Sequence, residues 1–297
     1  MSDNALIGKA ETKPQDAVRT RSVIVDTLLK VAKWGILVAF FLFTLMPLLW
    51  LVLSSFKTNT ELLTAPFAFP EVWQFVNYAN AIRVAGLPGL FMNSVIVSSS
   101  STVLAMIVTS MAAFVFARET FRFQSAIMNT VVAGVLVPIV ALMVPYFRLI
   151  SNLGLHDTLL ALIITYTAIN IPISLFLLHG FMKIIPRELE EAAVMDGCSF
   201  VQRYTRIVFP LSRLGLVTAG TFVFLFSWNE FIYAMLLTSS RATRTLQLGI
   251  RFFVTQFFTD YTSMFAAIVL TVIPSIIVYI SFHDKIILGL TSGAMKG

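Results

Sequence analysis

Glu191-Ala192-Ala193-Val194-Met195-Asp196-Gly197 lies in the middle of a polar segment, residues 182–213, that separates two apolar runs of membrane-spanning length. Ile207 follows Gly197 with nine residues between them, and Pro210 comes three residues later. The polar segment holds nine charged residues, so we expect the chain to leave the membrane interior here and to re-enter it afterwards. The sequence therefore alternates between apolar spans and shorter polar connections.

The composition of the chain excludes a soluble domain. Apolar residues make up 58% of the 297 residues, charged residues make up 12%, and there are 27 Phe. A chain of this kind has too little polar surface to cover a globule exposed to water. One cysteine, Cys198, excludes an internal disulfide framework and a multi-Cys metal site, and the three His lack the spacing of metal ligands. We therefore expect a polytopic membrane protein without redox or metal chemistry.

Six apolar segments are long enough to cross a bilayer. About 20 helical residues, at a rise of about 1.5 Å each, span the roughly 30 Å hydrocarbon core. The sequence therefore predicts an all-α fold with six transmembrane helices, at residues 34–55, 91–117, 126–147, 158–181, 214–237 and 264–283.

The spans divide the chain into a membrane domain and two tails. We expect a cytoplasmic N-terminal tail at 1–33, a transmembrane domain at 34–288 and a cytoplasmic C-terminal tail at 289–297. The core of the transmembrane domain covers about 90–284 and contains the polar segment 182–213. The N-terminal tail lacks a short apolar core followed by a small-residue cleavage site, so we expect no cleaved signal peptide.

The basic residues indicate the orientation in the membrane. If the N-terminus is cytoplasmic, the inner segments hold 15 Lys and Arg and the outer loops hold 6. This distribution follows the positive-inside rule with both termini in the cytoplasm. The formal net charge of +6 is then explained by topology and by contacts with membrane lipid, and no nucleic acid partner is needed.

Local sequence signals predict two short helices in segment 182–213. Pro186 suits a first helical position, and the acidic residues after it oppose the positive end of a helix dipole. Gly197 can adopt the left-handed conformation that ends a helix. Ser199 and Gln202 form the pattern of a capping box for a second helix, which Pro210 bounds.

A helix–Gly–helix elbow at the inner surface suits the docking of a peripheral subunit. The small side chains of Ala192 and Ala193 allow another surface to approach the backbone, and Glu191 and Asp196 can meet basic groups. The alternative is an interfacial helix that lies on lipid. Such a helix is usually basic, with bulky apolar residues, whereas this one is acidic and rich in Ala, so the sequence favours docking.

This segment resembles the cytoplasmic coupling loop of the permease subunits of bacterial binding-protein-dependent ABC importers. The family pattern is E-A-A, three residues, G, nine residues, I, one residue, L-P. Here Phe209 replaces the usual Leu, and Leu214 stands where a second proline often follows. Other stretches look like the carbohydrate-uptake branch, and in particular like the maltose-type second permease: residues 91–95, 112–118, 228–231 and 289–297.

The resemblance implies the type I ABC importer permease fold and one half of a translocation pore in the bacterial cytoplasmic (inner) membrane. A second homologous permease would complete the pore, two copies of a cytoplasmic ATPase would bind ATP and Mg²⁺, and an extracytoplasmic solute-binding protein would deliver a sugar. Segment 182–213 is called the EAA loop below. The residues to which the resemblance assigns ATPase coupling are Glu190, Glu191, Ala192, Ala193, Asp196, Gly197, Ile207 and Pro210.

Two other classes of protein are open from the residues alone. The sequence has no G-x-x-x-x-G-K-[ST] motif, so a phosphate-cradling loop for ATP must lie on another chain and this chain is not expected to be an enzyme. An ion-coupled secondary transporter of a small polar solute would need intramembrane charges, and Glu230 is the one acid placed well inside a span. A membrane-embedded enzyme would need a cluster of His and carboxylates, which the sequence does not suggest.

Polar residues of the fifth span are the candidates for the solute path. Trp228, Asn229 and Glu230 follow one another in its outer half, where a carboxylate should face protein or water rather than lipid. Carboxylate and amide groups can bond to sugar hydroxyls, and an indole can stack on a sugar ring. The alternative is that Glu230 binds a neighbouring span or a partner permease.

Overall fold

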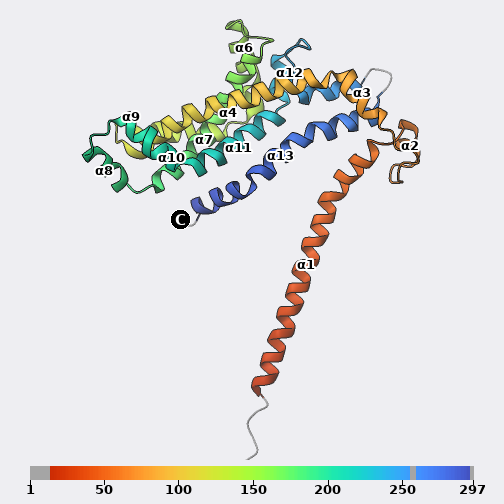
Figure 1. Ribbon diagram of the computed structural model, residues 1–297, viewed down its shortest axis with the longest axis horizontal. Helices are drawn as coiled ribbons and strands as arrows, with labels where there is room; N and C mark the ends of the chain where they lie inside the picture. The colour runs from red at the N-terminus through yellow and green to blue at the C-terminus, as the bar shows by residue number, and fades with distance from the viewer. Residues whose placement is uncertain (1–13, 255–258, 295–297) are drawn as a thin grey trace, which may run out of the picture.

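The protein is a bundle of long helices from which the first helix projects as an arm (Figure 1). The computed structural model describes residues 14–254 and 259–294. Within these ranges the secondary structure is helical, apart from turns, loops and an isolated bridge between Val254 and Thr259. The predicted all-α fold is confirmed.

The helices differ widely in length, from single turns to spans of more than thirty residues. In chain order they are α1 (Pro14–Ser54), α2 (Asn59–Thr64), α3 (Val76–Ala85), α4 (Leu87–Arg118), α5 (Gln124–Ala133), η1 (Gly134–Leu136), η2 (Ile139–Leu142), α6 (Met143–Asn152), α7 (Leu159–Ile184), α8 (Glu188–Met195), α9 (Phe200–Arg203), η3 (Tyr204–Val208), α10 (Phe209–Leu211), α11 (Arg213–Asn229), α12 (Ile232–Leu237), η4 (Leu246–Phe253) and α13 (Tyr261–Ala294).

Packing of α4 against α7 is the most extensive contact between helices, and α11 and α13 add to this core. Small residues line the contact, including the fully buried Ala105 and Ala161. The Ser101 hydroxyl donates to the Ile163 carbonyl at 3.3 Å, and the Thr167 hydroxyl donates to the Ser101 carbonyl at 3.4 Å. Small side chains let membrane helices approach closely, and their hydroxyls link the two backbones.

The number of long apolar helices agrees with six spans if two bent pairs each count as one. Four helices are long and apolar enough to cross a membrane, namely Thr27–Ser54, Leu87–Arg118, Leu159–Ile184 and Tyr261–Leu288. Two bent pairs meet the same test, namely Gln124–Leu136 with Ile139–Asn152, at 101°, and Phe200–Leu211 with Arg213–Asn229, at 75°.

The third predicted span, 126–147, is wrong as a single helix. The chain bends by 101° between η1 and η2, at Val137 and Pro138. Val137 is extended, with φ −75° and ψ 121°. A residue before proline is disfavoured in the α-helical conformation, and proline has no N–H to continue the helix. The apolar composition continues across this break, so it does not reveal the bend.

The fifth predicted span, 214–237, is also interrupted. Helix α11 ends at Asn229, and Glu230 is extended, with φ −68° and ψ 127°. The Glu230 carboxylate accepts hydrogen bonds from the backbone N–H groups of Tyr233, at 2.8 Å, and Ala234, at 3.0 Å. A side chain that takes up the first free N–H groups of α12 starts a new helix at this point, as an N-cap does.

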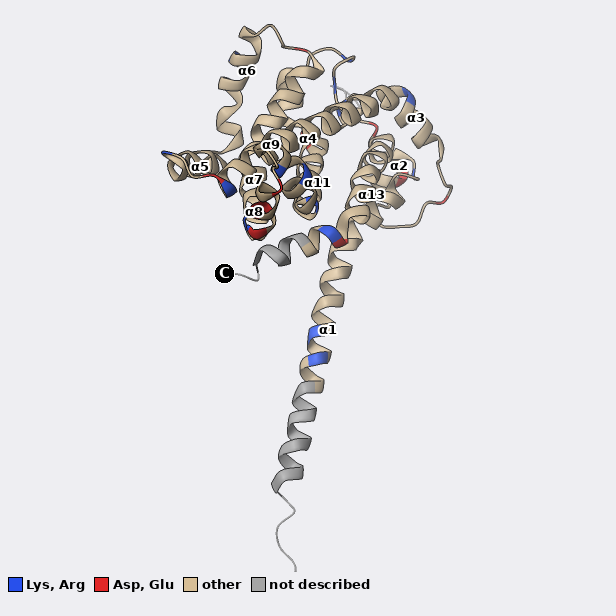
Figure 2. Ribbon diagram, turned by 60° about the vertical axis from the view of Figure 1, so that its left-hand side comes forward, with Lys and Arg blue, Asp and Glu red and all other residues tan. Residues whose placement is uncertain are grey.

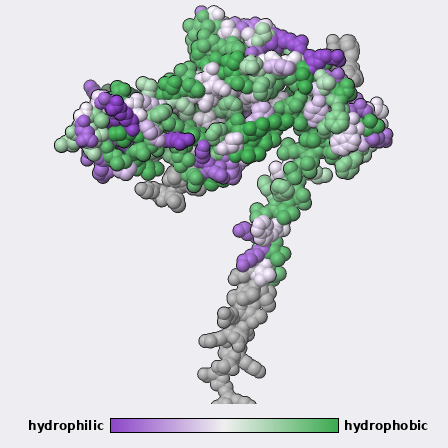
Figure 3. All heavy atoms as spheres, viewed as in Figure 1, coloured by the Kyte–Doolittle hydropathy of each residue, from purple (hydrophilic) through white to green (hydrophobic). Residues whose placement is uncertain are grey.

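Helix α1 has little contact with the rest of the chain. The most apolar window of Thr27–Ser54 has no buried residue, and Figure 3 shows hydrophobic side chains around the described part of the arm. Its C-terminal end joins the bundle, where the rings of Trp50 and Phe265 lie 5.5 Å apart. The apolar surface of α1 therefore needs lipid or another protein to cover it.

The helices extend into both predicted tails. Helix α1 begins at Pro14, so residues 14–33 of the expected N-terminal tail continue the first span as a helix. Helix α13 reaches Ala294, so residues 289–294 of the expected C-terminal tail are also helical. The remaining parts of the tail predictions, residues 1–13 and 295–297, lie outside the described residues.

Asp157 fixes the loops at the end of the bundle opposite the EAA loop. Its carboxylate accepts from the Thr243 hydroxyl and from the backbone N–H groups of Ser239, at 2.8 Å, and Ser240, at 3.0 Å. These donors, with the Thr243 hydroxyl as the largest contributor, hold the pKa of Asp157 well below its usual value. The connection before α7 is thereby tied to the loop after α12.

Close contact between α11 and α7 requires the absence of a side chain at Gly215. A Cβ there would lie 2.6 Å from Cγ and 2.8 Å from Cβ of Phe181, and side-chain rotation cannot move the Phe181 Cβ away because its position is set by the backbone. We expect Gly215→Ala to lower the free energy of unfolding by about 1–3 kcal/mol. Gly220→Ala on the same helix is the control, because its new methyl would have no contact shorter than 3.6 Å. Thermal unfolding in detergent would contradict this prediction if both variants melted alike.

Candidate functional site

The EAA loop forms one end of the helix bundle. Helices α8, α9 and α10 lie together there, beyond the ends of α4 and α7 (Figure 1). Figure 2 shows acidic and basic residues gathered at α8, in contrast to the uncharged helices behind it. A polar elbow is therefore presented at one end of an apolar bundle, as the sequence predicts.

The predicted elbow is present, with one difference in where its first helix begins. Gly197 follows α8 with φ +84°, in the left-handed region that favours glycine. The Ser199 hydroxyl accepts from the Gln202 N–H at 3.3 Å, and the Gln202 side chain accepts from the Ser199 N–H at 2.7 Å, which confirms the capping box. Helix α8 begins at Glu188, however, so Pro186 precedes it rather than taking its first position.

The second helix of the elbow runs past the proline that was expected to bound it. After α9 the chain makes a π-helical turn, η3, and continues through α10, which contains Pro210. The wider turn accommodates a residue without an N–H donor. The chain turns by 75° only at Ser212, whose hydroxyl donates to the Val208 carbonyl at 2.7 Å. Ile207 is half-buried and Pro210 is exposed.

Helix α8 has an open face and an inner face. The side chains of Glu191, Ala192 and Asp196 are exposed, and Met195 is 87% exposed. The inner face holds the two buried residues of the helix, Glu190 and Ala193. The residues assigned to ATPase coupling therefore divide into a surface group and an internal group.

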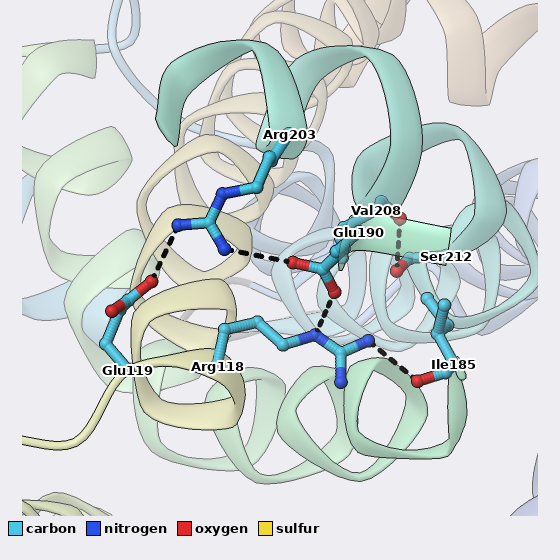
Figure 4. Close-up of polar contacts among 7 residues, drawn as sticks. All are labelled: Arg118, Glu119, Ile185, Glu190, Arg203, Val208 and Ser212. Carbon is cyan, nitrogen blue, oxygen red and sulfur yellow. Dashed lines mark hydrogen bonds and ion pairs between the residues drawn. The ribbon is translucent and has the colours of Figure 1, made fainter. Parts of the chain in front are cut away.

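The buried Glu190 belongs to a cluster of four charged side chains (Figure 4). The Glu190 carboxylate lies 2.6 Å from Nε of Arg118, and a second nitrogen of Arg118 donates to the Ile185 carbonyl at 2.9 Å. Arg203 lies 2.9 Å from the Glu119 carboxylate and 3.7 Å from that of Glu190. Two arginines and two glutamates thus balance each other beneath α8.

A cavity of about 470 Å³ opens beside this cluster. Its lining combines charged groups of both signs with apolar side chains near the end of α8, and consists of Arg118, Arg187, Glu190, Glu191, Val194, Met195 and Arg203. Within the described ranges there is no group of three or more His, Cys, Asp or Glu that could hold a metal ion.

Sequence reasoning missed Arg118, Glu119 and Arg203 as members of this site. Arg118 ends the second span and was noted as part of a family stretch, but its partner Glu190 lies 72 positions later in the chain. Spacing along the chain gives no indication of this pairing. The available signal was the position of a full charge at the end of an apolar span, where an unpaired arginine is costly.

The three candidates for the solute path have separate environments. Trp228 is 1% exposed, stacks on Phe224 at 5.9 Å and donates to the Thr271 carbonyl at 3.3 Å, so its ring belongs to the core of the chain. Asn229 is exposed, and its amide donates to the Leu225 carbonyl at 2.8 Å. The three residues therefore do not form one surface.

Glu230 is occupied by the chain itself. Besides the two backbone bonds that start α12, its carboxylate accepts from the Tyr166 hydroxyl at 2.6 Å. Tyr166 lies on α7 and is fully buried. This arrangement matches the alternative reading, in which Glu230 binds a neighbouring span, while a direct contact with solute stays a prediction.

Comparison with known proteins identifies the family. Residues 103–287, which include the EAA loop, match the model of the binding-protein-dependent transport system inner membrane components. The chain belongs to this family. It is therefore a membrane permease of the ABC importers, with the six-span fold that the bent pairs allow.

Known permeases match along most of their length. The diacetylchitobiose uptake system permease of Streptomyces coelicolor is 34% identical, over 88% of this chain and 87% of that one. The trehalose transport system permease of Mycobacterium tuberculosis is 32% identical, over 86% of this chain and 93% of that one. A solved bacterial alginate importer is similar in fold, with a TM-score of 0.77, 21% identity and coverage of 88% and 97% of the two chains.

Backbone strain at the elbow can be tested at Gly197. A Cβ there would meet nothing within 4 Å, so the cost of a side chain arises from the positive φ and not from a clash. We expect Gly197→Val to destabilise the elbow by about 1–3 kcal/mol. Gly197→Asn should lose less, because Asn tolerates the left-handed conformation. Hydrogen exchange of α8 measures the difference, and equal protection in the two variants would contradict the prediction.

The role of Glu230 can be tested through stability. Glu230→Ala leaves the buried Tyr166 hydroxyl and two N–H groups of α12 without their acceptor. We expect a loss of about 1–3 kcal/mol in the free energy of unfolding. Asn229→Ala is the matched control, since that side chain is exposed, donates within its own helix and accepts only one long bond, from Gln247 at 3.5 Å. Thermal unfolding of purified permease gives the comparison, and a Glu230→Ala protein as stable as wild type would show that the carboxylate has another role.

Proposed function

We propose that this permease forms one half of the pore of an ATP-driven sugar importer and that its EAA loop receives the motion of the ATPase. The coupling role is supported mainly by the open face of α8, which carries acidic side chains and the small side chain of Ala192. The substrate class is supported by the names of the relatives, which transport diacetylchitobiose and trehalose.

The open face of α8 has the chemistry of a docking surface. Glu191 and Asp196 provide negative charge, and Ala192 between them has only a methyl group. A basic partner surface can therefore come close to the helix backbone while its cations meet the two carboxylates. The exposed side chain of Met195, at 87%, adds an adaptable apolar contact. We infer that this partner is a cytoplasmic ATPase that binds ATP and Mg²⁺.

The half-pore role is supported by the unburied α1. A permease that bound only lipid could keep such a helix at its surface, but a second homologous permease would also give it a packing partner. Two related permeases would then present two EAA loops, one for each copy of the ATPase. An extracytoplasmic solute-binding protein is the remaining partner that the family description implies.

The proposed assembly sets an orientation. The EAA loop must lie in the cytoplasm to meet an ATPase, and the distribution of basic residues agrees with this side. In this orientation both termini are cytoplasmic, and helices α2, α3 and η4 lie on the extracytoplasmic side of the membrane. Glu230 gives no support to ion coupling, since its carboxylate already accepts three hydrogen bonds.

Purification of the transporter from its own membrane tests the proposal. We expect wild-type permease to bring along an ATPase and a second permease. Glu191→Lys should reduce the recovered ATPase by about tenfold or more, because charge reversal at a docking contact costs more than 1.4 kcal/mol. Glu188→Lys is the matched control, since Glu188 is also acidic, exposed and in the first turn of α8.

The two results against the proposal have different meanings. If wild-type permease purifies alone and transports solute in proteoliposomes without ATP, the chain is a secondary carrier. If the wild type brings the ATPase and the Glu191→Lys and Glu188→Lys variants lose it equally, the loop binds through its overall charge and the EAA residue has no specific part.

A further inference from the structure

Helix α8 is held to the rest of the permease by very few side chains. Of its eight residues, only Glu190 and Ala193 are buried. Ala193 contributes one methyl group, and the other six side chains, from Glu188 to Met195, are exposed. Any force applied to the outer face of α8 must therefore pass to the bundle mainly through Glu190, Ala193 and the backbone at its two ends.

The Glu190 carboxylate leads directly to the two central helices. Its partner Arg118 is the last residue of α4 and is 8% exposed. The same guanidinium donates at 2.9 Å to the carbonyl of Ile185, which caps the end of α7. A single arginine thus connects α8 to α4 and α7, which form the largest helix contact in the chain. Figure 4 shows these contacts around the guanidinium.

Arg203 provides a second and weaker connection. It lies on α9, 2.9 Å from Glu119 and 3.7 Å from Glu190. The Glu119 side chain is 41% exposed, compared with 5% for Glu190, so solvent screens the outer pair more strongly. The buried pair and the outer pair therefore offer a natural comparison within one cluster.

We propose that the buried Arg118–Glu190 ion pair is the joint through which displacement of α8 reaches α4 and α7. Glu190 is then a positioning residue that acts inside the permease and does not touch the ATPase. This inference rests on the proposed docking of an ATPase on the open face of α8. It separates the two adjacent glutamates, since Glu191 binds the partner and Glu190 transmits its movement.

The two buried side-chain contacts of α8 resist different movements. The Ala193 methyl resists compression strongly but separation only weakly, because the dispersion attraction of a single methyl group is small. The buried Arg118–Glu190 ion pair resists separation more strongly, because its opposite charges lie 2.6 Å apart and attract each other with little screening by solvent. A transporter that cycles must move its spans in both directions, and this pair is the stronger of the two buried side-chain contacts of α8 when the helix moves outward.

The test uses the whole transporter in proteoliposomes, with permease variants at the buried pair. Glu190→Asp keeps the charge but shortens the side chain by one methylene, which opens the 2.6 Å contact. We expect the complex to assemble with its ATPase, while solute transported per ATP hydrolysed falls by about tenfold, within the usual range of coupling between sites. The reciprocal exchange, Arg118→Glu with Glu190→Arg, should recover part of this ratio.

Glu119→Gln is the matched control, because it breaks only the outer pair, and we expect it to keep the wild-type ratio. The proposal is overturned if assembled Glu190→Asp complexes transport as much solute per ATP as wild type. It is also overturned if Glu119→Gln lowers the ratio equally. Loss of the ATPase from wild type would instead refute the proposed function, since the ratio is measured only on assembled complexes.

Discussion

Close packing between α4 and α7 organises the rest of the molecule. In a membrane there is no hydrophobic force that drives one apolar helix onto another, so helices associate where small side chains let their backbones meet. Ser101 and Thr167 serve both needs here, since they are small and their hydroxyls bond across the contact. The ends of these two helices define the position of Arg118 and Ile185. The EAA loop is built on those ends, and α11 lies against the same pair.

The charged residues at the end of the bundle are held by electrostatic pairing and not by the packing of small side chains. A buried arginine is tolerated when a carboxylate neutralises it and when its other donors also find acceptors. The Glu190 carboxylate neutralises Arg118, and one nitrogen of the guanidinium donates to the Ile185 carbonyl. The first of two adjacent glutamates is thus turned inward and the second outward. Two adjacent glutamates can therefore serve different purposes, one inside the permease and one on its surface, because neighbouring side chains on a helix point about 100° apart.

Local chemistry explains which features the sequence could predict. Four of the six predicted spans, the Gly197 turn and the Ser199 capping box depend on residues close together in the chain, and they are present in the structure. The break at Glu230 depends on a side chain that captures backbone donors within an apolar run, which averaged hydropathy cannot detect. The Arg118–Glu190 pair joins positions far apart in sequence, so only the folded chain brings it into view.

The unburied first helix has a consequence for the life of the protein in the cell. Since α1 gains almost no packing energy from its own bundle, a newly made copy can place this helix in the bilayer before the other helices have packed. An apolar helix in lipid has its backbone hydrogen bonds satisfied within itself, so this first span is stable there without its bundle. Substitutions on its lipid-facing surface should then alter membrane insertion more than they alter the packing of the later helices.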